Sequence, residues 1–327
     1  MISPERKNIK MSKQNKEEKF KSKIGGQALI EGIMMRGIGI AAMACRLPDG
    51  SIDVETWEIK NGKQAPWYKK TPFIRGCFNF AETMAEGIRC TMKSAEKQMT
   101  EDDEEEEPSK FEKWLEEKFG DKLVNVIMVI SIVLAMVLCV LLFKFLPMLI
   151  SKLLLSAGVP DWGRTVAEGV IKLALLIGYF YVISLTDSMH TTFMYHGAEH
   201  KTIACYEAQK ELTVENIRPM CRFHPRCGTS FIMIVILISI IVGMFLPWKN
   251  IGIRLLMQLV LLIPEASIAY ELIKLAGRYD NIFTRIISAP GLWLQHITTK
   301  EPNDKQIEVA IAALTPCLPK EDEEDEW

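Results

Sequence analysis

The sequence has almost no net charge, few histidines and no ordered cysteine spacing. Its 39 Lys and Arg residues nearly balance 41 Asp and Glu residues, so no overall positive field points to a nucleic-acid partner. Residues 1–22 carry charges throughout and have no apolar core, which predicts that they are not a secretory signal. The eight cysteines lack the spacing of a disulfide framework, and we expect them to be thiols.

Long apolar runs are present, although the mean hydropathy of the whole chain is only +0.10. About 20 apolar residues in a helix span a hydrocarbon core roughly 30 Å thick. Four runs of about this length predict transmembrane helices: Leu123 to Phe143, Val166 to Thr186, Cys227 to Trp248, and Gly252 to Leu275. We therefore expect a mainly α integral membrane protein with about four transmembrane helices, for which the lipid bilayer is a partner.

Basic residues near the ends of these runs predict the orientation of the chain in the membrane. Lys and Arg are frequent before the first run, between the second and third runs, and after the fourth, and they are few in the other two loops. Cytoplasmic loops carry the excess of these residues. We expect a location in the cell membrane, with both termini and the histidine-rich loop in the cytosol.

The residues before the first run indicate a small N-terminal α+β region in the cytosol. Asp49-Gly50 separates two runs with strand character, 40–47 and 51–59, and Asp-Gly in such a break is typical of a β-hairpin. Apolar residues recur at helical spacing over 73–99, which predicts an amphipathic helix. The glycine-rich stretch 24–37 has two open interpretations, a strand with glycine bulges or a binding loop.

Changes of composition divide the chain into six segments. A basic, lysine-rich composition predicts a disordered N-terminus, and two acidic runs predict a linker and a tail. In chain order we expect a disordered N-terminus (1–23), an α+β region (24–100), an acidic linker (101–109), a four-helix transmembrane region with a cytosolic His/Cys-rich loop (110–280, loop 188–229), cytosolic C-terminal helices (281–315) and an acidic tail (316–327). We also expect a short helix at 110–119, a turn within 289–299, and Asp304 as the N-cap of the last helix.

A histidine–glutamate motif lies in the loop between the second and third runs. His196 and His200 are four residues apart, so on a helix they lie on one face, one turn apart. Two imidazoles in this arrangement can bind one metal ion. Glu199 completes the order His-x-x-Glu-His, which is that of the inverted zinc proteases. The motif predicts a zinc site with Glu199 as the catalytic base for a water molecule, and the alternative is a solvated loop with capping histidines.

Further metal ligands must come from a separate segment. His224 and Cys227 lie in a turn-like stretch and are the candidates that complete the shell. Glu207 is seven residues beyond His200, about 10 Å along a straight helix, so we place it outside the shell. Four protein ligands make a closed, structural site, whereas three leave a position for water. Both cases stay open at this point.

Ionisable residues within or beside the apolar runs are further candidates. Glu265 lies near the middle of the fourth run, where a charge costs several kcal/mol, so it is protonated, paired or beside a polar cavity. Lys172 in the second run is a possible partner, although it can pair instead with Glu168, four residues earlier. Glu271 and His190 lie near the inner ends of their runs, where they can converge close to the metal site.

Several motifs resemble the YqhQ-like family of bacterial membrane proteins, over roughly residues 24–314. They are Ile24-Gly25-Gly26-Gln27-Ala28, Glu31-Gly32-Ile33-Met34-Met35-Arg36-Gly37, Pro72-Phe73-Ile74-Arg75-Gly76, Tyr195-His196-Gly197-Ala198-Glu199-His200-Lys201, His224-Pro225-Arg226-Cys227-Gly228-Thr229-Ser230, Pro290-Gly291-Leu292-Trp293-Leu294-Gln295 with Thr298-Thr299, and Gln306-Ile307-Glu308-Val309-Ala310. The resemblance implies a multi-pass protein of the bacterial inner membrane. It also implies a metal-dependent enzyme with its metal at His196, His200 and the His224/Cys227 segment, whereas Cys221 is not part of the family pattern.

Two functions follow as hypotheses from these observations. The first is a metal-dependent hydrolase with a cytosol-facing zinc site. The alternative is a non-enzymatic membrane assembly or transport factor that acts with a membrane-protein partner. In that case the His/Cys cluster is structural and Glu265 lines a polar path. Neither hypothesis involves nucleic acid.

Overall fold

The computed structural model describes residues 20–59, 66–99, 123–154 and 158–319. The acidic linker, the short helix expected at 110–119, the acidic tail and most of the basic N-terminus lie outside the described residues. The predictions made for those segments therefore stay predictions.

The first described residues form a four-stranded antiparallel sheet in the order β1-β2-β3-β4. Its strands are β1 (Gly25–Leu29), β2 (Gly32–Arg36), β3 (Ile40–Arg46) and β4 (Ile52–Glu58). The predicted hairpin is confirmed, since Arg46 pairs with Ile52 and Gly50 has the positive φ that glycine favours. The glycine-rich stretch is a second hairpin, so its interpretation as strand is confirmed.

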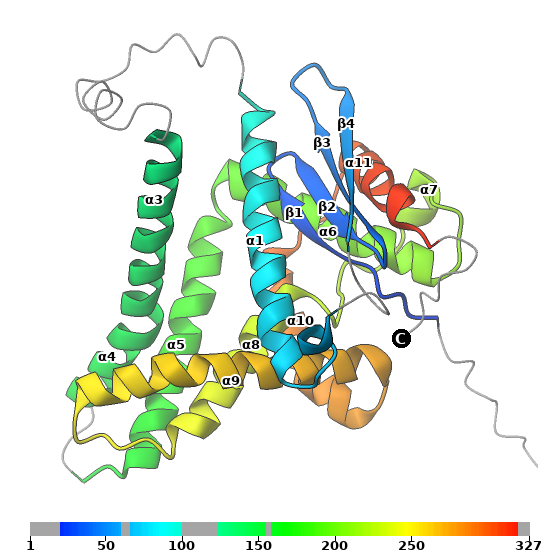
Figure 1. Ribbon diagram of the computed structural model, residues 1–327. Helices are drawn as coiled ribbons and strands as arrows, with labels where there is room; N and C mark the ends of the chain where they lie inside the picture. The colour runs from blue at the N-terminus through cyan, green and yellow to red at the C-terminus, as the bar shows by residue number, and fades with distance from the viewer. Residues whose placement is uncertain (1–19, 60–65, 100–122, 155–157, 320–327) are drawn as a thin grey trace, which may run out of the picture.

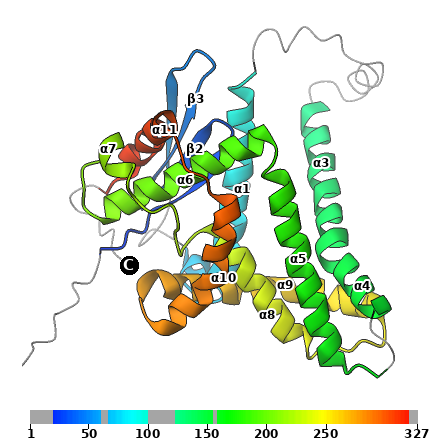
Figure 2. The ribbon, with the colours of Figure 1, turned by 180° about the vertical axis from the view of Figure 1, so that it is seen from behind.

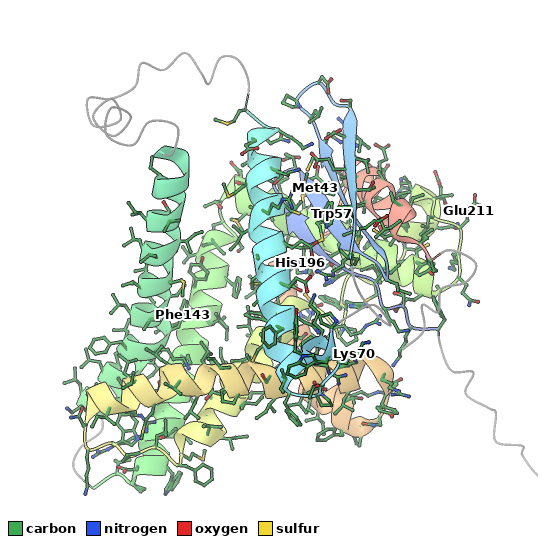
Figure 3. The ribbon with its side chains drawn as sticks, in the orientation of Figure 1. Met43, Trp57, Lys70, Phe143, His196 and Glu211 are labelled. Carbon is green, nitrogen blue, oxygen red and sulfur yellow. The ribbon has the colours of Figure 1, made fainter. Side chains whose placement is uncertain are left out.

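Helices cover both faces of this sheet, because alternate strand residues point to opposite sides. On one face Met34 and Met43 pack against Cys90 of α1 (Ile74–Glu96). On the other face Ile33 and Met35 pack against α6 (Asp187–Glu207) and α11 (Asp304–Leu314). Figure 1 shows the sheet between these helices, and Figure 3 labels Met43 beside α1. The sheet thus fixes α6, which carries the histidine motif.

Three helices among the described residues are long and apolar enough to cross a membrane. The first comprises residues 129–153, which run through α3 (Leu123–Val140), the π-helical turn η5 (Leu141–Phe145) and α4 (Leu146–Leu154). The second is α5 (Asp161–Ile183), and the third is α9 (Ile251–Arg278). Their outer faces expose large apolar side chains, such as Leu134 at 65% and Ile263 at 63%. Such surfaces are stable in lipid, so the predicted membrane association is supported.

Four transmembrane helices are not confirmed. The third expected span is α8 (Gly228–Gly243), which has 16 residues, fewer than the roughly 20 that a bilayer requires. The helix is short at both ends, because Cys227 is extended and the chain turns after Met244. α8 packs between α5, α9 and α10 (Ile282–Thr298), and Figure 2 shows it running beside α10.

Two local expectations for the C-terminal helices are wrong. The turn expected within 289–299 is absent there, since α10 continues through Pro290. The N-cap of α11 is Asn303 rather than Asp304, because the Asn303 side chain accepts from the Gln306 amide while Gln306 reaches back to the Asn303 amide. This reciprocal capping box provides hydrogen-bond acceptors for two backbone amides, whereas an Asp304 side chain acting as the N-cap would provide an acceptor for one.

The remaining short helices connect these elements. They are η2 (Trp67–Lys69), α7 (Val214–Ile217) and η6 (Thr315–Cys317). α7 lies in the loop that returns the chain from α6 to Cys227, and it packs on α11. The predicted cytosolic loop therefore consists of α6, α7 and the turn that follows.

Candidate metal centre

The two histidines of the motif lie one turn apart on α6, as their spacing predicted. Their ring centroids are 4.4 Å apart. Gly197 between them allows a close approach, because a Cβ there would lie 2.0 Å from the Lys300 carbonyl oxygen. A glycine within a helix costs about 1 kcal/mol relative to alanine. Here it lets α6 touch the segment that follows α10.

Cys227 completes a group of three metal-binding side chains. One ligand atom from each of His196, His200 and Cys227 lies within 4.8 Å of the other two. The His196 Nε2 atom is 3.1 Å from the Cys227 sulfur, and His200 also hydrogen-bonds that sulfur. His200 and Cys227 are buried. Cys227 is the N-cap of α8, where the helix dipole favours a thiolate.

Backbone carbonyls orient both imidazole rings. The Nδ1 atom of His196 is 2.7 Å from the Thr298 carbonyl oxygen, and Nδ1 of His200 is 2.6 Å from that of Arg222. A carbonyl only accepts, so each Nδ1 carries a hydrogen, and each Nε2 is the ring nitrogen that remains for the sulfur or for a metal ion. Histidines that bind metals are held in the same way.

The charges of His196 and Cys227 are coupled. Burial lowers the pKa of His196, but the neighbouring Cys227 thiolate and the hydrogen bond to it act more strongly together and raise that pKa to about 9. Burial raises the pKa of Cys227, yet the two imidazoles hold it well below its usual range. One proton therefore lies between Nε2 and Sγ in the absence of metal, and metal binding releases such a proton.

Glu199 lies beside this group and is buried, with 5% of its surface exposed. Its carboxylate accepts a hydrogen bond from the backbone of Gly26 in β1, and burial raises its pKa against the lowering effect of both histidines. The Oε2 atom has no hydrogen-bond partner among the described residues. A buried acceptor without a donor costs about 1–3 kcal/mol, so this oxygen favours a water molecule or ligand in the site.

His224 lies next to the group but faces another partner. Its ring centroid is 5.5 Å from that of His200, and its Nε2 atom is 3.0 Å from a guanidinium nitrogen of Arg226. Arginine only donates, so His224 accepts at Nε2. Arg226 in turn pairs with Glu207. Glu207 thus lies outside the group of three, as its distance along the helix predicted, and it fixes Arg226.

The other candidate residues lie apart from this centre. Glu271 forms an ion pair with Arg75 of α1, and His190 is exposed near the start of α6. The structure does not bring these two side chains together at the motif. Glu265 is buried within α9 and faces Lys144 at 3.9 Å.

Residues of α10 position the site, and their residue types alone did not predict these roles. The Gln295 side chain accepts from the His224 amide and donates to the His224 carbonyl, both at 2.8 Å. It thereby holds the segment that leads to Cys227. Thr298 acts through its carbonyl, which leaves no signature in the sequence. Both residues lie in a motif of the family pattern, and that was the available signal.

The donor set fits zinc. Two imidazole nitrogens and one thiolate are typical zinc ligands, and tetrahedral Zn–N and Zn–S bonds place ligand atoms about 3.3–3.6 Å apart. The 3.1 Å contact between His196 and Cys227 needs only a small opening to match. Three protein ligands leave one tetrahedral position, and the unpartnered Glu199 oxygen lies beside the group.

Comparison with known proteins supports the resemblance found in the motifs. The family model described as a protein of unknown function, DUF1385, matches residues 71–320. The chain is 35% identical over 299 residues to the uncharacterized protein YqhQ of Bacillus subtilis (strain 168), which covers 90% of this chain and 92% of that relative. No solved structure shows a significant match. The chain therefore belongs to the YqhQ-like DUF1385 family.

Proposed function

We propose that the protein is a membrane-anchored, zinc-dependent hydrolase. His196, His200 and Cys227 are the zinc ligands, and Glu199 is the catalytic base. The observation that carries this proposal is the convergence of three ligand atoms within 4.8 Å. Both Nδ1 atoms are already bonded to carbonyls, so the free nitrogens face the sulfur. The buried, unpartnered Oε2 of Glu199 supports a water molecule at the same place.

Each residue of the site has a separate role in the proposed hydrolysis. A bound zinc ion would supply a Lewis acid that makes a water molecule acidic. Glu199 accepts the proton of the attacking water at Oε2, because burial raises the pKa of its carboxyl group toward the range in which a general base works. The Gly26 amide holds the carboxylate in place. The carbonyls of Thr298 and Arg222 keep both rings fixed during the reaction.

The membrane helices give this site its location. The excess of Lys and Arg before the first apolar run, near α6 and at the C-terminal end of α9 supports a cytosol-facing site with both termini in the cytosol. α6 follows α5 after a break at Ser184 to Thr186, so the helix that carries the motif begins directly beyond a candidate span. A substrate in or near the membrane suits this position.

One observation favours the alternative function. His224 lies beside His200, and a rotation of its ring away from Arg226 would supply a fourth ligand. A closed, four-ligand site is structural. The protein would then be a non-enzymatic assembly or transport factor that acts on a membrane-protein partner.

Replacing Glu199 by glutamine separates the two functions. We expect the cobalt-loaded Glu199→Gln protein to keep the thiolate-to-cobalt absorption band of the wild type, because no ligand is changed. We expect its hydrolysis of a fluorogenic peptide library to fall by about 100-fold or more, the usual contribution of a general base. The measurements are visible absorption and fluorescence in detergent. A cobalt band in both proteins without hydrolysis by the wild type would exclude the hydrolase and leave the structural site.

A further inference from the structure

A second group of ionisable side chains lies between the candidate membrane spans, away from the metal centre. Lys144 Nζ lies 3.9 Å from Glu265 Oε2, and Lys172 Nζ lies 3.7 Å from Glu168 Oε1. The side chains of Glu265, Lys172 and Lys144 are 3%, 5% and 13% exposed. Charges at such depth are costly in a membrane and are kept where they have a role.

In one part of this group the carboxylate is fully bonded. Glu168 accepts from Arg254 at 2.9 Å and from Gln258 at 2.8 Å, so both of its oxygens have direct donors. Arg254 is itself completely buried, and it also donates to the Leu246 carbonyl at 2.7 Å. These contacts have hydrogen-bond geometry. They account for Glu168 as a structural carboxylate that joins α5 to α9.

The part around Glu265 is different. Its Oε2 atom is buried and has no hydrogen-bond partner among the described residues. A separation of 3.9 Å from Lys144 makes an ion pair without a direct hydrogen bond, which leaves water as the remaining donor for Oε2. A buried acceptor beside an ammonium donor favours a bound water molecule, whereas an apolar site stays dry.

Both helices are irregular at this contact. Lys144 lies in the π-helical turn η5, and π-helical turns are frequent at functional sites. Pro264 inside α9 directly precedes Glu265, and proline leaves the carbonyl of Val260 without its helical donor. η5 packs against α9. Two irregular helical turns and a carboxylate whose Oε2 atom accepts no hydrogen bond from the described residues therefore meet inside the spans.

The charges around Glu265 come from few elements. Lys144 and Lys172 act on it from η5 and α5, and α8 has no ionisable side chain. The other helices packed on α9 use their charges elsewhere: Arg75 of α1 pairs with Glu271, Arg285 of α10 pairs with Asp280, and His296 of α10 stacks on Phe223. Among the described residues, Lys144 and Lys172 are therefore the charged groups that act on Glu265.

We propose that Glu265 is a proton-binding carboxyl group inside the membrane-spanning region, reached by water held between Lys144 and Lys172. A proton from this water binds Oε2 and returns to the water when the carboxyl group ionises. No other bond forms or breaks. This function is independent of the hydrolase, since it uses none of the residues of the metal centre. It gives the spans a proton site that a membrane enzyme or transporter can couple to movement of its helices.

Infrared difference spectroscopy of the full-length protein in liposomes tests this assignment. We expect a carboxylic-acid carbonyl band to grow as the buffer is changed from mildly alkaline to mildly acidic, and to shift to lower frequency in D2O because water reaches the group. Glu265→Gln should lose this band. Glu271→Gln, a change seven residues further along α9 at a carboxylate paired with Arg75, should retain it.

Two results would overturn the proposal. One is a spectrum of Glu265→Gln that still contains the D2O-sensitive band. The other is a wild-type protein in which no such band changes over the whole pH range, as for a permanently ionised or sealed carboxyl group. If Glu265→Gln does not fold, Glu265→Asp replaces it, and the band is then expected to persist at a shifted frequency.

Discussion

Replacing Gly197 by alanine is expected to destabilise the protein by about 2 kcal/mol or more. Alanine favours the helix by about 1 kcal/mol, but the added methyl group would lie 2.0 Å from the Lys300 carbonyl oxygen. Overpacking costs about 1–3 kcal/mol and occasionally more. The backbone must shift here, so the larger cost applies. The measurement is the temperature at which half of the detergent-purified protein is lost from its size-exclusion peak.

Gly178→Ala is the matched control for this change. Gly178 lies within α5, and a Cβ there meets nothing within 4 Å. The same substitution should therefore leave the stability unchanged or raise it by up to about 1 kcal/mol. An equal effect at both glycines would show that the contact between α6 and Lys300 is not required. Gly197→Ala should also weaken metal binding, because the adjacent Thr298 carbonyl orients His196.

Replacing Arg254 by methionine is expected to cost about 3–5 kcal/mol, the usual effect of leaving one charge of a buried pair without its partner. Arg254 is fully buried and holds Glu168 at 2.9 Å. It also lies 4.0 Å over the Trp248 ring. The change leaves the buried Glu168 carboxylate, between α5 and α9, without its ion-pair partner. The same thermal measurement should show a large fall, and a large share of the protein should aggregate.

The double variant Glu168→Gln with Arg254→Met tests whether the loss of stability comes from an unpaired buried charge or from lost packing. Neutralising both partners should recover part of the stability, since a buried ion pair adds little once both charges are absent. Recovery is incomplete because Arg254 also caps the carbonyl of Leu246. Arg278→Met, at the exposed end of the same helix, should have almost no effect. A double variant less stable than Arg254→Met would contradict this explanation.

The spacing of residues alone predicted much of the candidate site. A four-residue interval on a helix is enough to place His196 and His200 on one face, and the structure confirms this arrangement. The distance of Glu207 along the helix also placed it outside the group correctly. These predictions depend on the geometry within a single helix, which the sequence determines locally.

The choice between His224 and Cys227 could not be made from the sequence. Both lie in one turn segment, and a rotation of that segment decides which side chain reaches the histidines. Gln295 of α10 fixes the rotation through two hydrogen bonds to His224. The carbonyls of Thr298 and Arg222 were equally hidden, because any residue supplies a carbonyl. Contacts between segments far apart in the chain decide these features.

In the fold, too, features set by neighbouring residues were predictable from the sequence, and features set by distant contacts were not. The hairpin at Asp49-Gly50 was predictable because the turn chemistry is local. The short length of α8 was not, because the apolar run of residues 227–248 includes the extended Cys227 and the turn after Met244. Apolar composition indicates burial or lipid, and it does not show where the helix begins. The partner of Glu265 was likewise missed, since Lys144 lies in another span.

Metal content tests the central claim most directly. Elemental mass spectrometry of the purified protein should give about one zinc ion per chain, and His200→Ala and Cys227→Ala should each reduce this value close to zero. His190→Ala and Cys221→Ala are matched controls, since both side chains are exposed and both variants should retain the zinc. A wild-type protein that stays free of metal after zinc loading, or equal zinc in all five proteins, would contradict a metal centre at His196, His200 and Cys227.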